Sequence, residues 1–393
     1  MARSLTLLGM GITLCTSALL AQTSTSAKLT SVSTSPVAYV YVSHTPVNSG
    51  NLQVLGWKAA ANGSLTPIPG SPFAESISTM AVNGKYLFGA AENNFDVNSY
   101  LIEPDGSLRY AASTNVNQKH GCGSSFGLGL DHTGASLYNF SFYGDQYCAN
   151  NIFQAFAVNK PTGKLTYLNE TSSMLGDFRT LSFIGDNIYG YASGSYHFGS
   201  TILGVRRNAD GSLTELNINP TLPKARSGYV YDTFGAAADP LNHVAIPVVP
   251  FQGYGTPYGT FQLATYTASS TGNLTTTSTY ANMSQVDVGF VNILAMAPSG
   301  KLLAVGGATG LQVFHFNGAN PITHDTGVLA SGYFTSVYWD NENHLYALSI
   351  PTNGTKGELY VFTITPTGYT QAPGSPHAIN SPSSVIVQPL PRY

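Results

Sequence analysis

The chain has 393 residues, which is enough for two or three ordinary domains or for one large repeat array. Only 9% of the residues are charged, and the formal net charge is −3. The chain therefore lacks the basic surface expected of a nucleic-acid-binding protein, and its 43% hydrophobic content excludes an intrinsically disordered chain.

The N-terminal segment has the features of an export signal. Arg3 supplies a positive charge, residues 5–20 are mostly apolar, and Ala21 before Gln22 offers an acceptable cleavage point. A membrane anchor is the alternative, but the apolar stretch is short and contains several Thr and Ser residues. We therefore expect a secreted or periplasmic protein with no transmembrane segment after cleavage.

The predicted domain organisation follows from this signal. We expect a signal peptide at 1–21, a Ser/Thr-rich linker at 22–36 and a single folded domain at 37–393. No segment after the signal has a helical period, so the folded domain is predicted to be all-β.

A group of four short strands recurs along the folded domain. In its clearest copy an apolar strand at 76–82 precedes a turn at 83–85, a strand at 86–91, a strand at 97–102 and a turn at 104–106. A repeat of roughly 40–60 residues made of four strands is typical of a β-propeller blade. Seven innermost strands are expected near Ser78–Val82, Ser125–Leu130, Thr180–Ile184, Phe234–Ala238, Ile293–Ala297, Thr335–Trp339 and Ser383–Val387.

The phase of the repeat predicts how the ring closes. The domain starts with a strand that corresponds to the second strand of a repeat, at Tyr39–Val42, and ends with one that corresponds to the first, innermost strand, at Ser383–Val387. The C-terminal strand should therefore complete the blade that the N-terminal segment begins, which leaves no exposed sheet edge at the seam. We predict a monomeric seven-bladed β-propeller of four-stranded antiparallel blades.

The loops of such a fold divide between two faces. First-to-second and third-to-fourth turns lie on one face, here called the short-turn face, and all other connections lie on the opposite long-loop face. Long loops on a rigid scaffold are common binding sites, although their length also drifts on a tolerant surface. The long segments are expected at Tyr143–Asn151, Ser193–Gly199, Val249–Thr260, Pro351–Gly357, Asn115–Ser124, Asn217–Thr233, Ser278–Asn292 and Asp325–Phe334.

Two cysteines remain if Cys15 leaves with the signal. Cys122 lies in a blade-to-blade link and Cys148 in a second-to-third loop of the same blade, so both belong to the long-loop face. An even cysteine count in an exported chain favours a disulfide, with two unpaired thiols as the alternative. An unstrained bond between Cys122 and Cys148 would contribute roughly 3 kcal/mol to stability.

Several repeated phrases carry a family resemblance. They are Gly84-Lys85-Tyr86-Leu87-Phe88, Thr162-Gly163-Lys164-Leu165-Thr166, Gly300-Lys301-Leu302-Leu303-Ala304-Val305 and the two Pro-Gly-Ser-Pro segments at 69–72 and 373–376. The chain resembles the lactonase-type seven-bladed propeller family, which includes 6-phosphogluconolactonases, and the related surface propellers with Tyr-Val-Thr-Asn repeats. The resemblance covers nearly the whole folded domain and implies the fold more specifically than an activity.

Lactonases of this family carry Gly-Pro-Arg-His at the start of an innermost strand and a Glu just after the next strand. Glu92 matches the Glu by position, but no innermost strand supplies the Arg-His pair. Ring-opening of a lactone needs a base that activates water and a positive group at the developing oxyanion. The candidate catalytic residues are Glu92, Arg179 and His44, and each can equally be a hydrogen-bonded loop residue.

The remaining signals favour binding over chemistry. Neither zinc-ligand spacing, nor a compact acidic loop, nor a nucleophile motif is found, so no metal or cofactor is expected. Aromatic residues in the predicted loops suit the recognition of sugars or other polar ligands, and equally suit packing between loops. The candidate ligand-binding residues are Tyr143, Tyr196, His197, Tyr254, Tyr258 and Tyr333.

Three functions are consistent with these features. The leading hypothesis is an exported propeller that binds a small-molecule, glycan or protein ligand on its long-loop face. The alternatives are a divergent sugar-lactone hydrolase and a cell-surface protein-interaction propeller.

Overall fold

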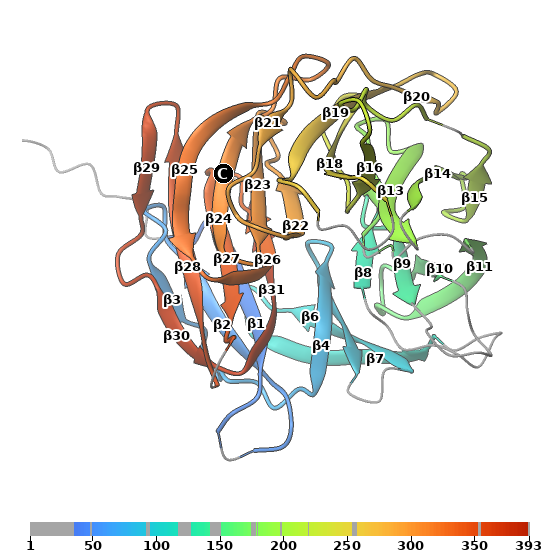
Figure 1. Ribbon diagram of the computed structural model, residues 1–393. Helices are drawn as coiled ribbons and strands as arrows, with labels where there is room; N and C mark the ends of the chain where they lie inside the picture. The colour runs from blue at the N-terminus through green and yellow to red at the C-terminus, as the bar shows by residue number, and fades with distance from the viewer. Residues whose placement is uncertain are drawn as a thin grey trace, which may run out of the picture. The chain divides into compact units, whose positions relative to one another are not determined.

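A computed structural model shows the folded domain as a ring of seven β-sheets (Figure 1). The described residues are 35–47, 49–91, 95–116, 127–141, 151–173, 178, 180–196, 199–218, 220–253, 258–352 and 355–391. Within them all regular elements are strands, and no helix is present that could cross a membrane. The predicted signal peptide lies outside the described residues, so that prediction stays untested.

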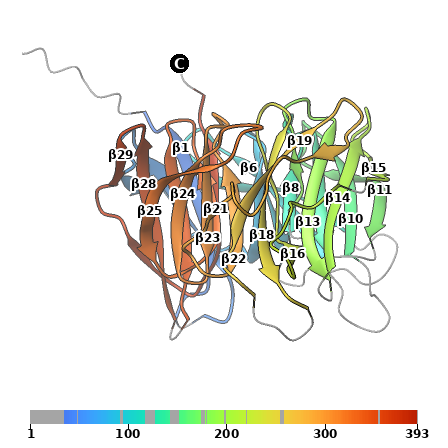
Figure 2. The same cartoon turned by 45° about the horizontal axis from the view of Figure 1, so that its top comes forward.

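Each sheet follows a path of four antiparallel strands, which confirms the predicted four-stranded blades. Figure 2 shows the sheets from the side, with their connections gathered at the two ends of the strands. From inner to outer strand, the first three blades are β31 (Pro382–Pro389), β1 (Ala38–His44), β2 (Gln53–Ala59) and β3 (Leu65–Pro67); β4 (Ile77–Val82), β5 (Tyr86–Ala91), β6 (Asp96–Ile102) and β7 (Leu108–Asn115); and β8 (Gly127–Leu130), β9 (Ser136–Ser141), β10 (Asn151–Val158) and β11 (Leu165–Ser173). The fourth and fifth blades are β12 (Ser182–Phe183), β13 (Tyr189–Tyr196), β14 (Gly199–Arg207) and β15 (Leu213–Leu216); and β16 (Val230–Thr233) with β17 (Ala237–Ala238), β18 (His243–Phe251), β19 (Gln262–Ala268) and β20 (Leu274–Thr275), with β21 (Ser284–Gln285) beside β19. The sixth and seventh blades are β22 (Val291–Met296), β23 (Leu302–Gly307), β24 (Gly310–His315) and β25 (Thr323–Ser331); and β26 (Tyr333–Trp339), β27 (His344–Ile350), β28 (Lys356–Thr365) and β29 (Gly368–Gln371), with β30 (His377–Asn380) beside β28.

The ring closes as predicted, by pairing the two ends of the domain in one sheet. β1 runs antiparallel to β31, with Val40 opposite Val387 and Val42 opposite Val385. The other edge of β1 pairs with β2, so β1 has no free edge.

The fifth inner strand differs from its prediction. It is divided into β16 and β17, and the expected strand at 234–238 is regular only at its end. The break falls at Gly235, whose φ is +73° and whose N–H donates to the Ser193 carbonyl of the preceding blade at 2.9 Å. A backbone N–H that bonds to the neighbouring blade cannot also extend the sheet, so the ladder stops there.

Two predicted long loops are also wrong. In the segment 193–199, residues 193–196 belong to β13 and Gly199 begins β14, with Ser193 paired with Ile202. The segment 325–334 consists mainly of β25 and β26, which a single Gly332 separates. In both places strand pairing extends through residues that the repeat phase assigned to a connection.

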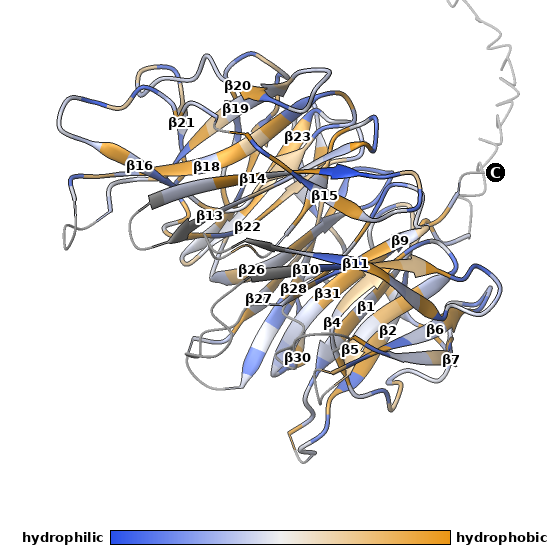
Figure 3. Cartoon of the chain, turned by 90° about the vertical axis from the view of Figure 1, so that its right-hand side faces the viewer, coloured by the Kyte–Doolittle hydropathy of each residue, from blue (hydrophilic) through white to orange (hydrophobic). Residues whose placement is uncertain are grey.

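Hydrophobic cores lie between the blades. Seven clusters of buried apolar side chains join the described sheets, one between each pair of neighbours around the ring. The cluster at the seam packs Val40 and Val42 against Tyr346 and Leu348. Figure 3 shows hydrophobic residues concentrated along strands such as β9 and β18. Because every cluster needs two blades, the blades stabilise one another rather than folding separately.

Second-strand tyrosines fasten blades to a turn of the next blade. The phenol donates to the carbonyl of a glycine in the third-to-fourth turn, where φ lies between +82° and +93°, a conformation that favours glycine. Burial raises the pKa of these phenols, in Tyr138 to about 12, so they remain donors at neutral pH. The pairs are Tyr41 with Gly106 (2.7 Å), Tyr138 with Gly211 (3.1 Å) and Tyr191 with Gly272 (2.8 Å).

The two Pro-Gly-Ser-Pro segments adopt the same local structure. Each follows a fourth strand, as predicted, and each contains a cis Ser-Pro bond. The serine of each segment accepts a hydrogen bond of 2.9 Å from a backbone N–H of the third strand: Ser71 from Gly56, and Ser375 from Val361. The motif therefore closes the outer edge of its blade and has a structural role.

Candidate functional site

Two cavities lie along the centre of the ring. One, of about 380 Å³, is lined by the first residues of the inner strands on the long-loop face, and we call it the mouth cavity. The other, of about 500 Å³, is lined by the last residues of the inner strands on the short-turn face, and we call it the rear cavity. Met80, Leu128 and Tyr338 line both cavities, so these side chains lie where the two meet.

The polar lining of the mouth cavity consists of neutral side chains. Several hydroxyl groups are already bonded: Ser384 donates to the Ser78 carbonyl at 2.8 Å, and Ser383 donates to the Ser43 carbonyl at 3.3 Å. The buried Thr335 hydroxyl, in contrast, has no hydrogen-bond partner among the described residues. The lining Ser and Thr residues are Thr79, Thr180, Ser193, Thr335, Ser336, Ser383 and Ser384.

Aromatic rings form part of the wall of the mouth cavity. Phe234 and Phe290 line it, with ring centroids 5.0 Å apart in an edge-to-face arrangement. Phe290 is 43% exposed. Tyr258 meets Phe234 at 6.1 Å, and its hydroxyl donates to the buried Asp232 carboxylate at 2.8 Å. This arrangement presents an apolar ring surface beside hydroxyl groups, which is the combination that carbohydrate-like ligands require.

Charge is missing from the described part of this lining. None of the described residues that line the mouth cavity is Asp, Glu, Lys, Arg or His. Tyr338 stays neutral as well, because burial raises the pKa of its phenol to about 12. Among the described residues, no group of three or more His, Cys, Asp or Glu side chains could hold a metal ion.

The structure places three of the predicted site residues. Tyr333 lines the mouth cavity, and Tyr258 touches its aromatic wall. His44, at the end of β1, is only 7% exposed and does not line the mouth cavity. Burial lowers the pKa of His44, partly offset by the nearby Asn380 backbone, so the ring favours the neutral form.

The other predicted site residues remain untested. Tyr196 is described only as the last backbone position of β13. Glu92, Arg179, Tyr143, His197, Tyr254, Cys122 and Cys148 lie outside the described residues.

Sequence reasoning missed the side chains that define the mouth cavity. Phe234 and Thr335 open two of the predicted inner strands, and Asn292 directly precedes a third. In a propeller the first residues of the inner strands surround the channel on one face, so the repeat phase contained this signal. Phe290 lies in a blade-to-blade link, and no repeat position identifies it.

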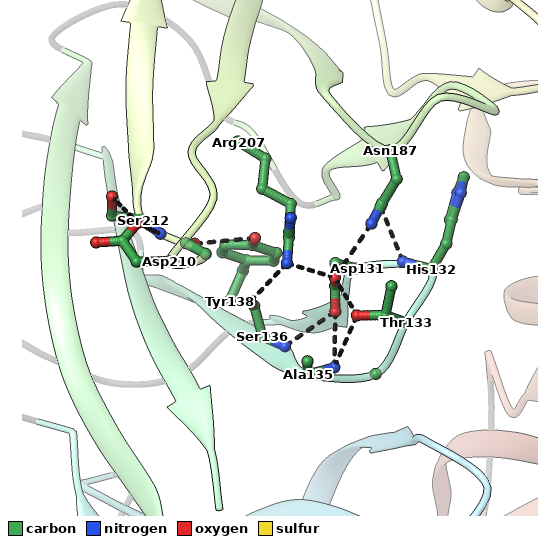
Figure 4. A network of polar contacts seen from close by, with 12 residues as sticks. Asp131, His132, Thr133, Ala135, Ser136, Tyr138, Asn187, Arg207, Asp210 and Ser212 are labelled. Carbon is green, nitrogen blue, oxygen red and sulfur yellow. Dashed lines mark hydrogen bonds and ion pairs between the residues drawn. The ribbon is translucent and has the colours of Figure 1, made fainter.

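A charged network on the short-turn face has a structural role. The Arg207 guanidinium contacts the fully buried Asp131 carboxylate at 2.9 Å and connects neighbouring blades (Figure 4). Burial alone would raise the pKa of Asp131, but hydrogen bonds from Thr133, Ser136 and Asn187, together with the Arg207 charge, hold it below its usual value. Because both carboxylate oxygens are occupied by these donors, Asp131 is unsuited to proton transfer.

Comparison with known proteins identifies the fold. No protein-family model and no curated protein matches the sequence. Solved structures do match: a 6-phosphogluconolactonase candidate from Bacteroides fragilis is 14% identical, with a TM-score of 0.58 over 89% of this chain and 97% of that one. A periplasmic gluconolactonase from Pseudomonas aeruginosa is 14% identical, with a TM-score of 0.57 over 90% and 99% of the two chains.

The fold also matches a third solved structure, which is not described as a lactonase. A hypothetical selenium-binding protein from Sulfolobus tokodaii is 10% identical, with a TM-score of 0.58 over 91% of this chain and 94% of that one. The chain thus has the fold of the lactonase-type seven-bladed propellers, and the low identities show the fold alone.

Proposed function

We propose that this chain, which has the fold of lactonase-type seven-bladed propellers, binds a neutral, hydroxyl-rich ring compound in the mouth cavity. The observation that carries the proposal is the combination of the Phe234–Phe290 wall with neutral Ser and Thr residues in the lining of one cavity of about 380 Å³. An apolar ring face can stack on the phenyl groups while its hydroxyls bond to neutral side chains.

The lining argues for a neutral ligand. A phosphorylated or carboxylated compound needs cationic partners, and the described lining offers none. Simple sugars and sugar lactones carry no charge, and their volume suits a cavity of this size. The substrate class therefore resembles that of the gluconolactonase from Pseudomonas aeruginosa more than that of a phosphorylated lactone.

A titration with a panel of sugars and sugar lactones tests the proposal. Saturable binding should weaken at least about tenfold in Ser336→Trp, since an indole at this position would fill the mouth cavity. His132→Ala, on the rear cavity, is the matched control and should bind as the parent does. Absence of binding across the panel, or equal affinity in Ser336→Trp, would contradict the proposal; capture of a protein ligand instead would favour the cell-surface interaction alternative.

Hydrolysis of a sugar lactone is the second candidate function. It is favoured because Arg179 directly precedes Thr180, which lines the mouth cavity, and because the fold recurs in lactonases. Arg179 would stabilise the oxyanion, and Glu92 would activate water. Acid release from a sugar lactone, lost in Glu92→Gln, would establish this activity, and binding without turnover would exclude it.

We also propose that the protein is exported. The segment 1–21 has the features of a cleavable signal, and the Pseudomonas aeruginosa relative of the fold is a periplasmic protein. N-terminal sequencing of the protein recovered from the periplasm or medium should begin at Gln22. Recovery of the intact N-terminus from the cytoplasm alone would contradict export.

A further inference from the structure

A separate pocket lies in the fifth blade, at the long-loop end of the sheet β16–β18–β19–β20. Its volume is about 160 Å³, and it shares no lining residue with the mouth cavity. Its lining comes from the link before β16, from residues 250, 259, 260 and 262 in and between β18 and β19, and from Tyr280 and Gln285 in and before β21. The residues used below are Arg226, Tyr229, Gln262, Tyr280 and Gln285.

A positively charged side chain, Arg226, lines this pocket and has no acidic partner among the described residues. The Arg226 guanidinium carbon lies 4.9 Å from the centre of the Tyr280 ring, and Nη1 donates to the Tyr280 hydroxyl oxygen at 3.1 Å. No ion pair among the described residues involves Arg226, whereas Arg109 and Arg207 both contact carboxylates. Arg226 is exposed to solvent, and its contact with the Tyr280 ring positions the guanidinium where a ligand can reach it.

The other polar groups of the pocket are donors or amides. Because the Tyr280 oxygen accepts from Arg226, its own proton is available to a ligand. Tyr229, Thr260 and Gln285 also line the pocket, and no Asp or Glu does so among the described residues. The pocket therefore presents donors and one positive charge, which is the chemistry of an anion site.

A buried amide holds this arrangement in place. Gln262 is 3% exposed, and its Nε2 donates to the carbonyls of Tyr280 and Met283, both at 3.2 Å. Its Oε1 accepts from the Tyr231 hydroxyl at 3.1 Å. The segment that carries Tyr280 is thus fastened to the sheet before any ligand arrives, which reduces the entropy lost on binding.

We propose that this pocket binds the carboxylate of a small organic anion. Arg226 and the Tyr280 hydroxyl offer two donors to the two oxygens of a planar carboxylate, and the tyrosine rings flank the body of the ligand. A single guanidinium matches one negative charge, while phosphate commonly takes more than one cation. The site is independent of the proposed mouth-cavity function, because the two cavities share no residue.

Benzoate and benzamide form a direct test pair, because the two molecules have nearly the same shape and only benzoate carries a negative charge. Titration by calorimetry at constant ionic strength should show that benzoate binds the full-length protein at least about tenfold tighter than benzamide. Inorganic phosphate should bind more weakly than benzoate. Equal binding of benzoate and benzamide, or tighter binding of phosphate, would overturn the proposal without recourse to any variant.

Variants then assign the binding to Arg226. Arg226→Gln should weaken benzoate binding by about tenfold or more. The affinity of Arg226→Lys for benzoate should lie between those of Arg226→Gln and the parent protein. Arg109→Gln removes the same charge at a distant ion pair with Glu103 and should leave the affinity unchanged. An Arg226→Gln protein that unfolds like the parent and binds benzoate equally well would place the ligand elsewhere and refute the assignment.

Discussion

The hydroxyl of Tyr191 in the fourth blade donates a hydrogen bond of 2.8 Å to the carbonyl of Gly272 in the fifth. Both groups are buried, so the bond joins two blades out of contact with water. Removal of the hydroxyl in Tyr191→Phe should leave the carbonyl unsatisfied and lower the free energy of unfolding by about 1–3 kcal/mol.

Tyr266 provides a matched control for this prediction. It is as fully buried as Tyr191, but its hydroxyl has no partner among the described residues. Tyr266→Phe removes an unsatisfied polar atom and should be neutral or stabilising. Urea denaturation of both variants measures the difference, and equal losses would show that the interblade hydrogen bond contributes nothing.

Gly272 should be intolerant of a side chain for two separable reasons. Its φ is +82°, and a Cβ there would lie 2.6 Å from the Tyr189 ring. In contrast, Gly84 has φ of +89° and open space where a methyl group would be added. Gly84→Ala should cost about 1–2 kcal/mol from backbone strain, and Gly272→Ala about 1–3 kcal/mol more from overpacking. Equal unfolding free energies of the two variants would refute the packing part.

The ion pair between Asp131 and Arg207 should contribute far more than a surface pair. Arg207 is 16% exposed and Asp131 is fully buried, so Asp131→Asn would leave a mostly buried cation without its counter-charge. We expect a loss of about 3 kcal/mol in unfolding free energy. Glu103→Gln, which breaks the exposed pair with Arg109, should cost less than about 1 kcal/mol. Thermal denaturation of both variants measures this difference. Similar decreases in Tm for Asp131→Asn and Glu103→Gln would contradict the ranking.

The fold was predictable because its periodic features are local. Turns such as Asp210-Gly211-Ser212 recur, and each is held by its own side chain: the Asp210 carboxylate accepts from the Ser212 backbone at 3.0 Å and from its hydroxyl at 2.7 Å. The phase of these turns was enough to predict the closure of β31 onto β1. The division of the fifth inner strand was not predictable, because it depends on a bond from Gly235 to another blade.

The candidate sites could be predicted only in part. Repeat phase locates Thr335 at the start of an inner strand, but its unpartnered hydroxyl emerges only from tertiary packing. Similarly, Arg226 and Tyr280 are 54 residues apart, and nothing local in the sequence indicates that they meet. Binding pockets combine side chains from separate segments, whereas repeats reveal single segments.

The free energy of unfolding should fall as the pH drops below the usual pKa of a histidine side chain. Burial lowers the pKa of both His44 and His377 from 6.5, so the folded state binds fewer protons than the unfolded state in mildly acidic solution. By linkage, the free energy of unfolding decreases as pH falls through about 6.5, and the loss levels off below the lowered folded values.

Urea denaturation between pH 8 and pH 5 measures this slope. This slope should flatten in the double variant His44→Gln/His377→Gln, which removes both imidazoles. His132→Gln is the control, because His132 is exposed, and it should retain the parent slope. A double variant with the slope of the parent would show that other groups cause the pH dependence.

Tyr258 should stabilise the protein through the Asp232 carboxylate. Asp232 is fully buried, its Oδ1 has no partner, and the Tyr258 hydroxyl is its only hydrogen-bond donor among the described residues. Tyr258→Phe keeps the ring that packs against Phe234 but removes this donor. We expect a loss of about 1–3 kcal/mol in unfolding free energy, because a buried carboxylate is left unsatisfied.

A double-mutant cycle tests whether the loss acts through Asp232. Asp232→Asn replaces the buried carboxylate by a neutral amide, which is less costly to leave without a donor. In the Asp232→Asn background, Tyr258→Phe should therefore cost less than it does in the parent protein. Equal losses in the two backgrounds would show that Tyr258 contributes through ring packing, and that its hydrogen bond to Asp232 adds nothing to stability.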